Sequence, residues 1–275
     1  MSRAPGERVR RGIPLRAVVP NAVTALALCS ALFGIRFAIA GEWRWAVGAI
    51  IVAAVLDGLD GRIARMLHGA SRFGAELDSL SDVTAFGVAP AIILYQWVLQ
   101  PLERGSDLYE GWVKFGWLFA LSLAVCAALR LARFNANIDV EDQPHKSAGF
   151  LTGVPAPAGA GLALLPLYLW LAFDAEIFRH PMLVAPWLGV VAFLMISSIA
   201  TFSWTSLRLR RSVRLGALVA IALIGAALFS APWPTLSAFA IAYALLIPFS
   251  VASYARVRRR RAVSAAPTDE PEPRP

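Results

Sequence analysis

Charged residues are scarce in this chain of 275 residues. Asp, Glu, Lys and Arg make up 16% of it, whereas they make up about 25% of an average soluble domain. Hydrophobic residues account for 58%, and the mean hydropathy is +0.61. This composition argues against an ordinary soluble domain and predicts an integral membrane protein.

Cysteine and histidine are also rare. The two cysteines, Cys29 and Cys126, each lie in an apolar run. We interpret them as packing residues and not as a disulfide or a zinc site. The three histidines are scattered, and the sequence contains neither a GxxxxGK[ST] loop nor an HExxH motif. These absences argue against a P-loop nucleotide hydrolase and a zinc protease.

Long apolar stretches define the expected architecture, because a spanning helix needs about 20 mainly apolar residues. We expect an all-α membrane protein with about eight transmembrane helices. They are predicted at residues 20–40, 45–66, 79–99, 112–133, 153–173, 182–202, 214–230 and 234–254. The second stretch is apolar only up to Asp57, so its second half is expected to leave the membrane as a continuing helix. We therefore expect a basic segment at 1–19, one membrane catalytic domain at 20–254, and a basic, then Pro-rich and disordered tail at 255–275.

Basic residues alternate between loops, and the net charge is +8. They gather in the N-terminal segment, in the loops near 62–72, 130–146 and 204–214, and at the C-terminal end. The positive-inside rule then places both termini and the 57–82 region on the cytoplasmic side. We assign the positive charge to topology and expect no nucleic-acid partner.

Four of the few acidic residues crowd into positions 57–82. At about 100° per residue, the spacing places them on the faces of two successive helices. The first face carries Asp57, Asp60, Gly61, Ala64 and Arg65, and the second carries Gly74, Asp78 and Asp82. A short loop joins these helices, which predicts antiparallel neighbours whose acidic faces meet near the cytoplasmic surface.

Clustered carboxylates repel one another, and one aspartate at the bilayer centre costs about 2.5–3.5 kcal/mol. Cations would offset this cost, and oxygen-only ligands favour Mg²⁺, Mn²⁺ or Ca²⁺ over zinc. Small residues and the Arg65 guanidinium beside such a metal suit phosphate chemistry. The alternative is a set of helix caps and interfacial charges, which does not account for two matching acidic faces.

The pattern Asp57-x2-Asp60-Gly61-x2-Ala64-Arg65-x8-Gly74-x3-Asp78-x3-Asp82 resembles the signature of the CDP-alcohol phosphatidyltransferase family. The resemblance implies a six-helix catalytic core, and an acceptor hydroxyl that attacks the β-phosphorus of a CDP-alcohol and releases CMP. It implies one or two divalent ions, Mn²⁺ or Mg²⁺, on Asp57, Asp60, Asp78 and Asp82, with Asp82 also the general base. It further implies nucleotide or diphosphate contacts from Gly61, Ala64, Arg65, Ser71, Gly74, Asn21 and Thr24. For Asn21 and Thr24 the alternative is a role as N-terminal caps of the first helix.

Four further stretches are similar to the bacterial and archaeal branch of this family that uses serine. They are "VPNAVTALALCSALFGI", "LSDVTAFGVAPAIILY", "LRLARFNANI" and "FLTGVPAPAGAG". This similarity implies CDP-diacylglycerol and L-serine as substrates, a bacterial-type inner (cytoplasmic) membrane with the active site facing the cytoplasm, and a homodimer.

Two arginines favour serine as the acceptor. Arg130 and Arg133 lie three residues apart on one helix face, a guanidinium fits a carboxylate, and Asn135 could add a hydrogen bond. Both arginines could instead anchor the helix at the cytoplasmic surface or hold a lipid phosphate.

Two rival functions remain open at this point. The first is the same chemistry with choline, inositol or glycerol 3-phosphate as the acceptor. The second is a transporter or ion channel that uses the aspartates as a cation path. The aspartates cluster at one membrane face and no other predicted span carries a deep acidic residue, which favours the enzyme.

Overall fold

The computed structural model of the chain describes residues 15–69, 71–100, 107–136, 150–202 and 214–264. Helices form nearly all of this part, so the expected all-α class is confirmed. The extreme ends of the predicted N-terminal segment and C-terminal tail, residues 1–14 and 265–275, lie outside the described residues. The chain divides into two compact units, Met1–Ala85 and Phe86–Pro275.

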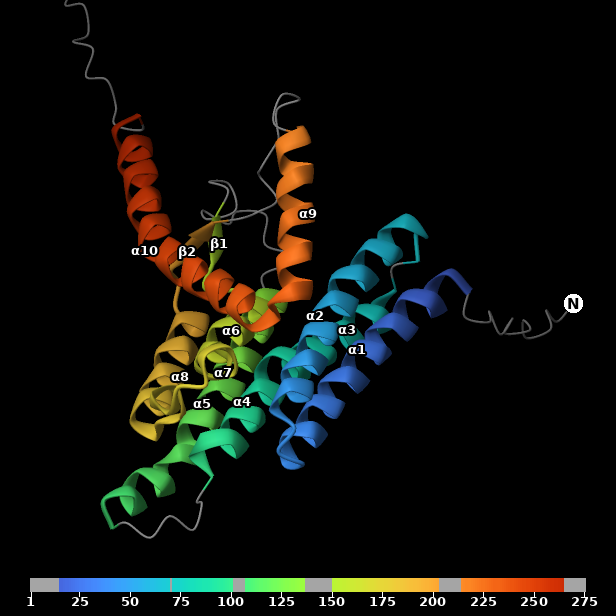
Figure 1. Ribbon diagram of the computed structural model, residues 1–275. Coiled ribbons are helices and arrows are strands. Elements are labelled where there is room, and N and C mark those ends of the chain that lie inside the picture. The colour runs from blue at the N-terminus through green and yellow to red at the C-terminus, as the bar shows by residue number, and fades with distance from the viewer. Residues whose placement is uncertain (1–14, 70, 101–106, 137–149, 203–213, 265–275) are drawn as a thin grey trace, which may run out of the picture. The chain divides into compact units, whose positions relative to one another are not determined.

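Three helices build the first unit: α1 (Leu15–Ile39), α2 (Trp43–Met66) and α3 (Arg72–Val83). Helix α1 packs against both α2 and α3 (Figure 1). A Cβ at Gly34 of α1 would lie 3.1 Å from the Ala46 carbonyl oxygen of α2, and Ala27, Ala31, Ala46 and Ala53 of these two helices are all fully buried. Small side chains let two helix backbones approach closely, as is common for helices in membranes.

Helix α2 continues without a break through Asp57 and Asp60 to Met66, so the expected helical continuation is confirmed. The chain then turns back, and Ser71 begins α3 as its N-cap. The Gly74 backbone N–H donates to the Ser71 hydroxyl at 3.0 Å, which satisfies one of the free amides at the helix start. This turn directs α3 back towards the level of the α2 aspartates.

The second unit is also helical. Its main helices are α4 (Ala89–Leu94), α5 (Asp107–Ala136), α6 (Ala156–Ala163), α7 (Leu165–Phe173), α8 (Pro181–Ile196), α9 (Arg214–Ser230) and α10 (Pro232–Ser264). The π-helical segments η1 (Thr84–Val88) and η2 (Tyr95–Leu99) flank α4, and the 3-10 turn η4 (Glu176–Arg179) precedes α8. Helix α5 packs against α8, and α10 packs against α7.

A short pair of strands and an arginine contact lie at the C-terminal end of α8. Strand β1 (Phe150–Thr152) pairs antiparallel with β2 (Ala200–Phe202). Gly153 follows β1 with φ at +74°, and its N–H donates to the Ile199 carbonyl at 2.7 Å. Arg133 of α5 donates to the carbonyls of Ile196 at 2.9 Å and Ser197 at 3.2 Å. Its guanidinium therefore satisfies carbonyl groups that the end of α8 leaves free.

Each of the eight expected apolar stretches is mainly helical. Within the described residues, four helices are long and apolar enough to span a membrane: Val18–Ile39, Arg72–Leu99, Phe115–Ala136 and Pro232–Ser253. The pair α6 and α7, bent by 44°, could make a fifth span, while α8 and α9 are apolar but shorter. The protein is thus an integral membrane protein, and a total of eight crossings stays a prediction.

Two helix boundaries differ from those predicted from the sequence. Helix α1 begins at Leu15, inside the segment expected to precede it, because the residues before Pro20 are apolar enough to continue the helix. Helix α10 runs on to Ser264, through the arginine run that was expected to start the tail. Arginine and alanine are good helix formers, and the first proline after this run comes only at Pro267.

The backbone at Gly153 gives a stability prediction. A Cβ there would lie 2.8 Å from the carbonyl oxygens of Met195 and Ser197, and the positive φ alone costs a non-glycine residue about 1–3 kcal/mol. We expect Gly153→Ala to lower the thermal unfolding midpoint of the detergent-purified protein. Gly161→Ala is the matched control, because it adds a methyl group in α6 where nothing lies within 4 Å. Equal midpoints for the two variants would contradict this account of the turn.

Candidate functional site

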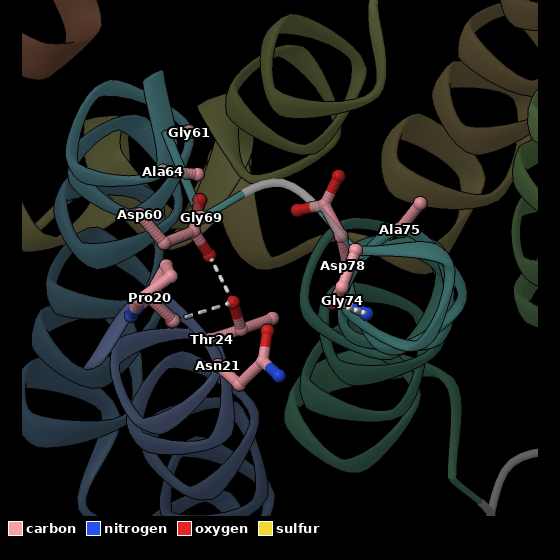
Figure 2. A pocket seen from close by; sticks show the side chains of 11 residues that line it. Pro20, Asn21, Thr24, Asp60, Gly61, Ala64, Gly69, Gly74, Ala75 and Asp78 are labelled. Carbon is pink, nitrogen blue, oxygen red and sulfur yellow. Dashed lines mark hydrogen bonds between the residues drawn. The ribbon is translucent and has the colours of Figure 1, made fainter. Parts of the chain in front are cut away.

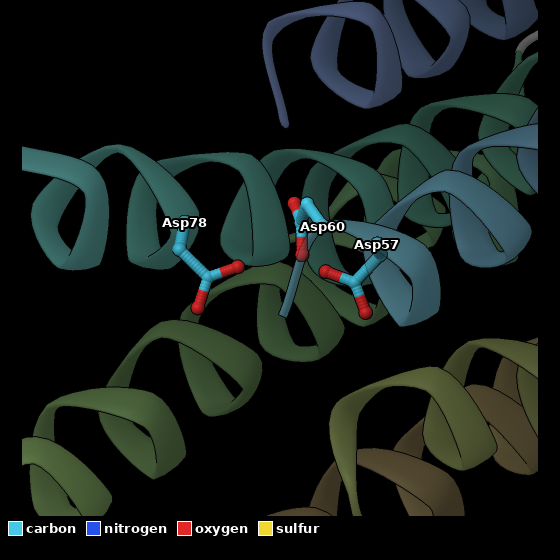
Figure 3. Close-up of side chains that lie close together, drawn as sticks. All are labelled: Asp57, Asp60 and Asp78. Carbon is cyan, nitrogen blue, oxygen red and sulfur yellow. The ribbon is translucent and has the colours of Figure 1, made fainter. Parts of the chain in front are cut away.

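The carboxylates of α2 and α3 converge. Asp57 and Asp60 lie one turn apart on α2, Asp78 lies on α3, and one carboxylate oxygen from each falls within 4.8 Å of the others. Figure 3 shows the three side chains directed towards one another. Asp60 is buried and the other two are half-buried. The predicted meeting of two acidic faces is therefore present in the first unit.

Asp82 joins this cluster from the next turn of α3. Its carboxyl group lies within hydrogen-bonding reach of the Asp57 carboxyl group. Its Oδ1 atom is buried and has no hydrogen-bond partner among the residues that the structure describes. A buried oxygen of this kind is costly unless something donates to it or coordinates it. A bound cation or a proton would therefore stabilise the cluster.

The donor set fits a hard divalent cation. It consists of carboxylate oxygens, which suit Mg²⁺, Mn²⁺ and Ca²⁺. Three carboxylates whose oxygens lie within 4.8 Å repel one another, and a divalent ion is the simplest group that would relieve this repulsion. Asp57, Asp60 and Asp78 could therefore hold a divalent metal ion.

A pocket adjoins the cluster in the first unit (Figure 2). It is lined by Pro20, Asn21 and Thr24 of α1, by Asp60, Gly61 and Ala64 of α2, by Gly69 of the turn, and by Ser71, Gly74, Ala75 and Asp78. Most of the residues predicted to contact the nucleotide or diphosphate are in this lining. Arg65 is not, and its side chain is exposed.

Two glycines of the predicted signature serve different purposes. A Cβ at Gly74 would lie 2.6 Å from Asn21 Oδ1 and 3.1 Å from Ser71 Oγ, so the absence of a side chain lets α3 approach α1. A Cβ at Gly61 would meet nothing within 4 Å. Gly61 therefore leaves open space in the pocket wall.

Asn21 and Thr24 are not helix caps, because α1 begins at Leu15 and both residues lie inside it. The cap alternative is therefore wrong. The Thr24 hydroxyl lies 2.6 Å from Asp60 Oδ2 and 3.1 Å from the Pro20 carbonyl oxygen.

Ser81, a residue not predicted to belong to the site, is buried and donates to the Thr24 carbonyl at 3.4 Å. Its only signal in the sequence is its position between Asp78 and Asp82 on α3. A serine at that position could face the same neighbours as the aspartates.

The residues predicted to bind the acceptor lie at the end of α5, in the second unit. Arg130 is half-buried and Asn135 is exposed. The Arg133 guanidinium binds the carbonyls of Ile196 and Ser197. This contact gives Arg133 a structural role that was not predicted from the sequence.

The chain is similar to known proteins over most of its length. A family model described as CDP-alcohol phosphatidyltransferase matches residues 17–258. The CDP-diacylglycerol--serine O-phosphatidyltransferase of Mycobacterium tuberculosis is 37% identical over 246 residues, which cover 90% of this chain and 82% of the relative. The enzyme of that name from Mycobacterium leprae is 36% identical, covering 89% and 77%. An archaetidylserine synthase from Methanothermobacter thermautotrophicus is 32% identical, covering 66% and 68%. This chain belongs to the CDP-alcohol phosphatidyltransferase family.

Proposed function

We propose that the protein transfers the phosphatidyl group of CDP-diacylglycerol to L-serine and releases phosphatidylserine and CMP. The observation that carries the chemistry is the convergence of Asp57, Asp60 and Asp78 within 4.8 Å. The choice of serine rests on relatives that are 36–37% identical over about nine-tenths of the chain and are named for that acceptor.

The reaction exchanges one phosphate ester for another. The serine hydroxyl oxygen forms a bond to the β-phosphorus, and the bond from that phosphorus to the bridging oxygen of CMP breaks. The hydroxyl proton passes to Asp82, which acts as the general base. Its buried Oδ1 has no partner within the described part of the chain, which supports this role because an unpaired carboxylate oxygen can accept a proton.

Asp57, Asp60, Asp78 and Asp82 would hold one or two divalent ions, Mn²⁺ or Mg²⁺. When bound, such ions supply positive charge that stabilises the phosphate oxygens and the departing CMP. Pocket residues would position the donor beside them. Gly61 and Ala64 leave room for the diphosphate, while Asn21, Ser71 and Gly74 line the same pocket. Arg65 would reach the diphosphate from outside this lining.

Acceptor binding is assigned to the end of α5. The serine carboxylate needs a cationic partner, and Arg130 supplies a half-buried guanidinium, with Asn135 as a further hydrogen-bonding group. Arg133 belongs to the same proposed set. Because it already binds two carbonyls of the chain, its contribution would be to hold the end of α5 in place as well as to attract the carboxylate.

The proposed setting is a bacterial-type inner membrane, with residues 20–254 as the catalytic domain. Arginines flank the acidic helices at Arg62, Arg65 and Arg72, which under the positive-inside rule places the active site and both termini in the cytoplasm. We further propose a homodimer with membrane lipid around its apolar surface.

An acceptor assay tests the proposed function. The purified full-length protein is supplied with CDP-diacylglycerol, Mn²⁺ and one alcohol at a time: serine, inositol, choline or glycerol 3-phosphate. We expect CMP and phosphatidylserine with serine only. A product from another alcohol but not from serine would contradict the acceptor assignment. No CMP from any combination would favour the transporter or channel.

Asp82→Asn tests the general base. The amide keeps the shape of the carboxyl group but cannot take the proton, so we expect kcat to fall by about 10²–10⁴-fold, with binding of CDP-diacylglycerol retained. Asp174→Asn is the control, since it alters an exposed aspartate at the left-handed C-cap of α7, a conformation that asparagine also tolerates. Near-normal turnover of Asp82→Asn would exclude Asp82 as the base.

A further inference from the structure

Three buried polar side chains connect the helices of the first unit. Thr24 of α1 is 4% exposed, Asp60 of α2 is 5% exposed and Ser81 of α3 is 1% exposed. They are the only buried polar or charged residues within the described part of this unit. Burying such groups is costly unless they are hydrogen-bonded, and these three are bonded through one residue, Thr24.

The Thr24 hydroxyl has one proton and two neighbouring acceptors. Asp60 Oδ2 lies 2.6 Å from it, and the Pro20 carbonyl oxygen lies 3.1 Å from it. A hydroxyl that donates to an ionised carboxylate typically lies about 2.5–2.7 Å away, so the shorter contact has the geometry of a charge-assisted bond. Figure 2 shows Thr24 between Pro20 and Asp60. The proton is therefore assigned to the bond with Asp60.

The backbone of the same residue contacts the other acidic helix. Ser81 Oγ donates to the Thr24 carbonyl oxygen at 3.4 Å, and Ser81 stands between Asp78 and Asp82 on α3. Helix α1 packs against both α2 and α3. Thr24 thus connects the helix that carries Asp57 and Asp60 with the helix that carries Asp78 and Asp82.

We infer that Thr24 is a positioning residue for the carboxylate cluster, in addition to any contact with the nucleotide. This inference rests on the proposed function, which assigns the cluster to a divalent ion. A carboxylate has two oxygens with about four lone-pair sites, so the Thr24 bond orients Asp60 and still leaves it able to coordinate an ion. Ser81 fixes α3 relative to the same point.

Metal affinity measures this role directly. Loss of a group that hydrogen-bonds to a metal ligand typically weakens metal binding by about 10–100-fold. We expect this loss in Thr24→Val, which keeps the β-branched shape without the hydroxyl. Mn²⁺ affinity is measured by electron paramagnetic resonance of the free ion, with the purified full-length protein and no substrate.

Two variants serve as controls. Thr24→Ser restores the hydroxyl and is expected to bind Mn²⁺ nearly as well as the wild type. Ser30→Ala removes another hydrogen bond between α1 and α2, from Ser30 Oγ to the Ala49 carbonyl at 2.8 Å, and is expected to leave Mn²⁺ affinity unchanged. An equal loss in Ser30→Ala would attribute the effect to helix packing and overturn the inference.

The outcomes separate the inference from the proposed function. Wild-type Mn²⁺ affinity in folded Thr24→Val would overturn the positioning role, provided that Asp60→Asn weakens binding. Unchanged affinity in Asp60→Asn would instead refute the metal site itself. If Thr24→Val does not fold, the Thr24→Ser variant provides the test. A loss of Mn²⁺ affinity in Thr24→Ser as large as the loss in Asp60→Asn would show that the hydroxyl does not position the ligand.

Discussion

The main physical constraint on the first unit is the electrostatic repulsion among four aspartates that its helices hold close together. The chain carries few charges and its helices are mainly apolar, yet oxygens of Asp57, Asp60 and Asp78 lie within 4.8 Å of one another. Such a cluster is unfavourable in isolation, because each carboxylate disfavours the ionised form of the others. A bound divalent ion would offset this repulsion and would create a site with high affinity for phosphate oxygens.

The surrounding helices keep the carboxylates together. Gly34 lets α1 approach the α2 backbone at Ala46, and Gly74 lets α3 approach Asn21 on α1, because neither glycine has a side chain. The Ser71 cap begins α3 at the turn that follows α2. Helix α1 therefore acts as a common support for the two acidic helices, and its residue Thr24 hydrogen-bonds directly to a carboxylate.

Much of this arrangement could be predicted from local spacing. Asp57 and Asp60, like Asp78 and Asp82, share helix faces because an α-helix advances about 100° per residue, and the short spacing between the two helices predicts that the second pair turns back to the first. The bond between Thr24 and Asp60 joins residues 36 positions apart, and it depends on how three helices pack. The carbonyl contacts of Arg133 are likewise long-range. The first helix was predicted to start at residue 20 from its apolar run, but residues 15–19 are helical as well.

The central claim is that the cluster binds a divalent ion through the α2 and α3 carboxylates. The most direct test is anomalous diffraction at the manganese edge from crystals of the full-length protein grown with Mn²⁺. The account predicts an anomalous peak in contact with carboxylate oxygens of Asp57, Asp60 and Asp78. A peak elsewhere, or no peak at these side chains in crystals that contain Mn²⁺, would contradict it.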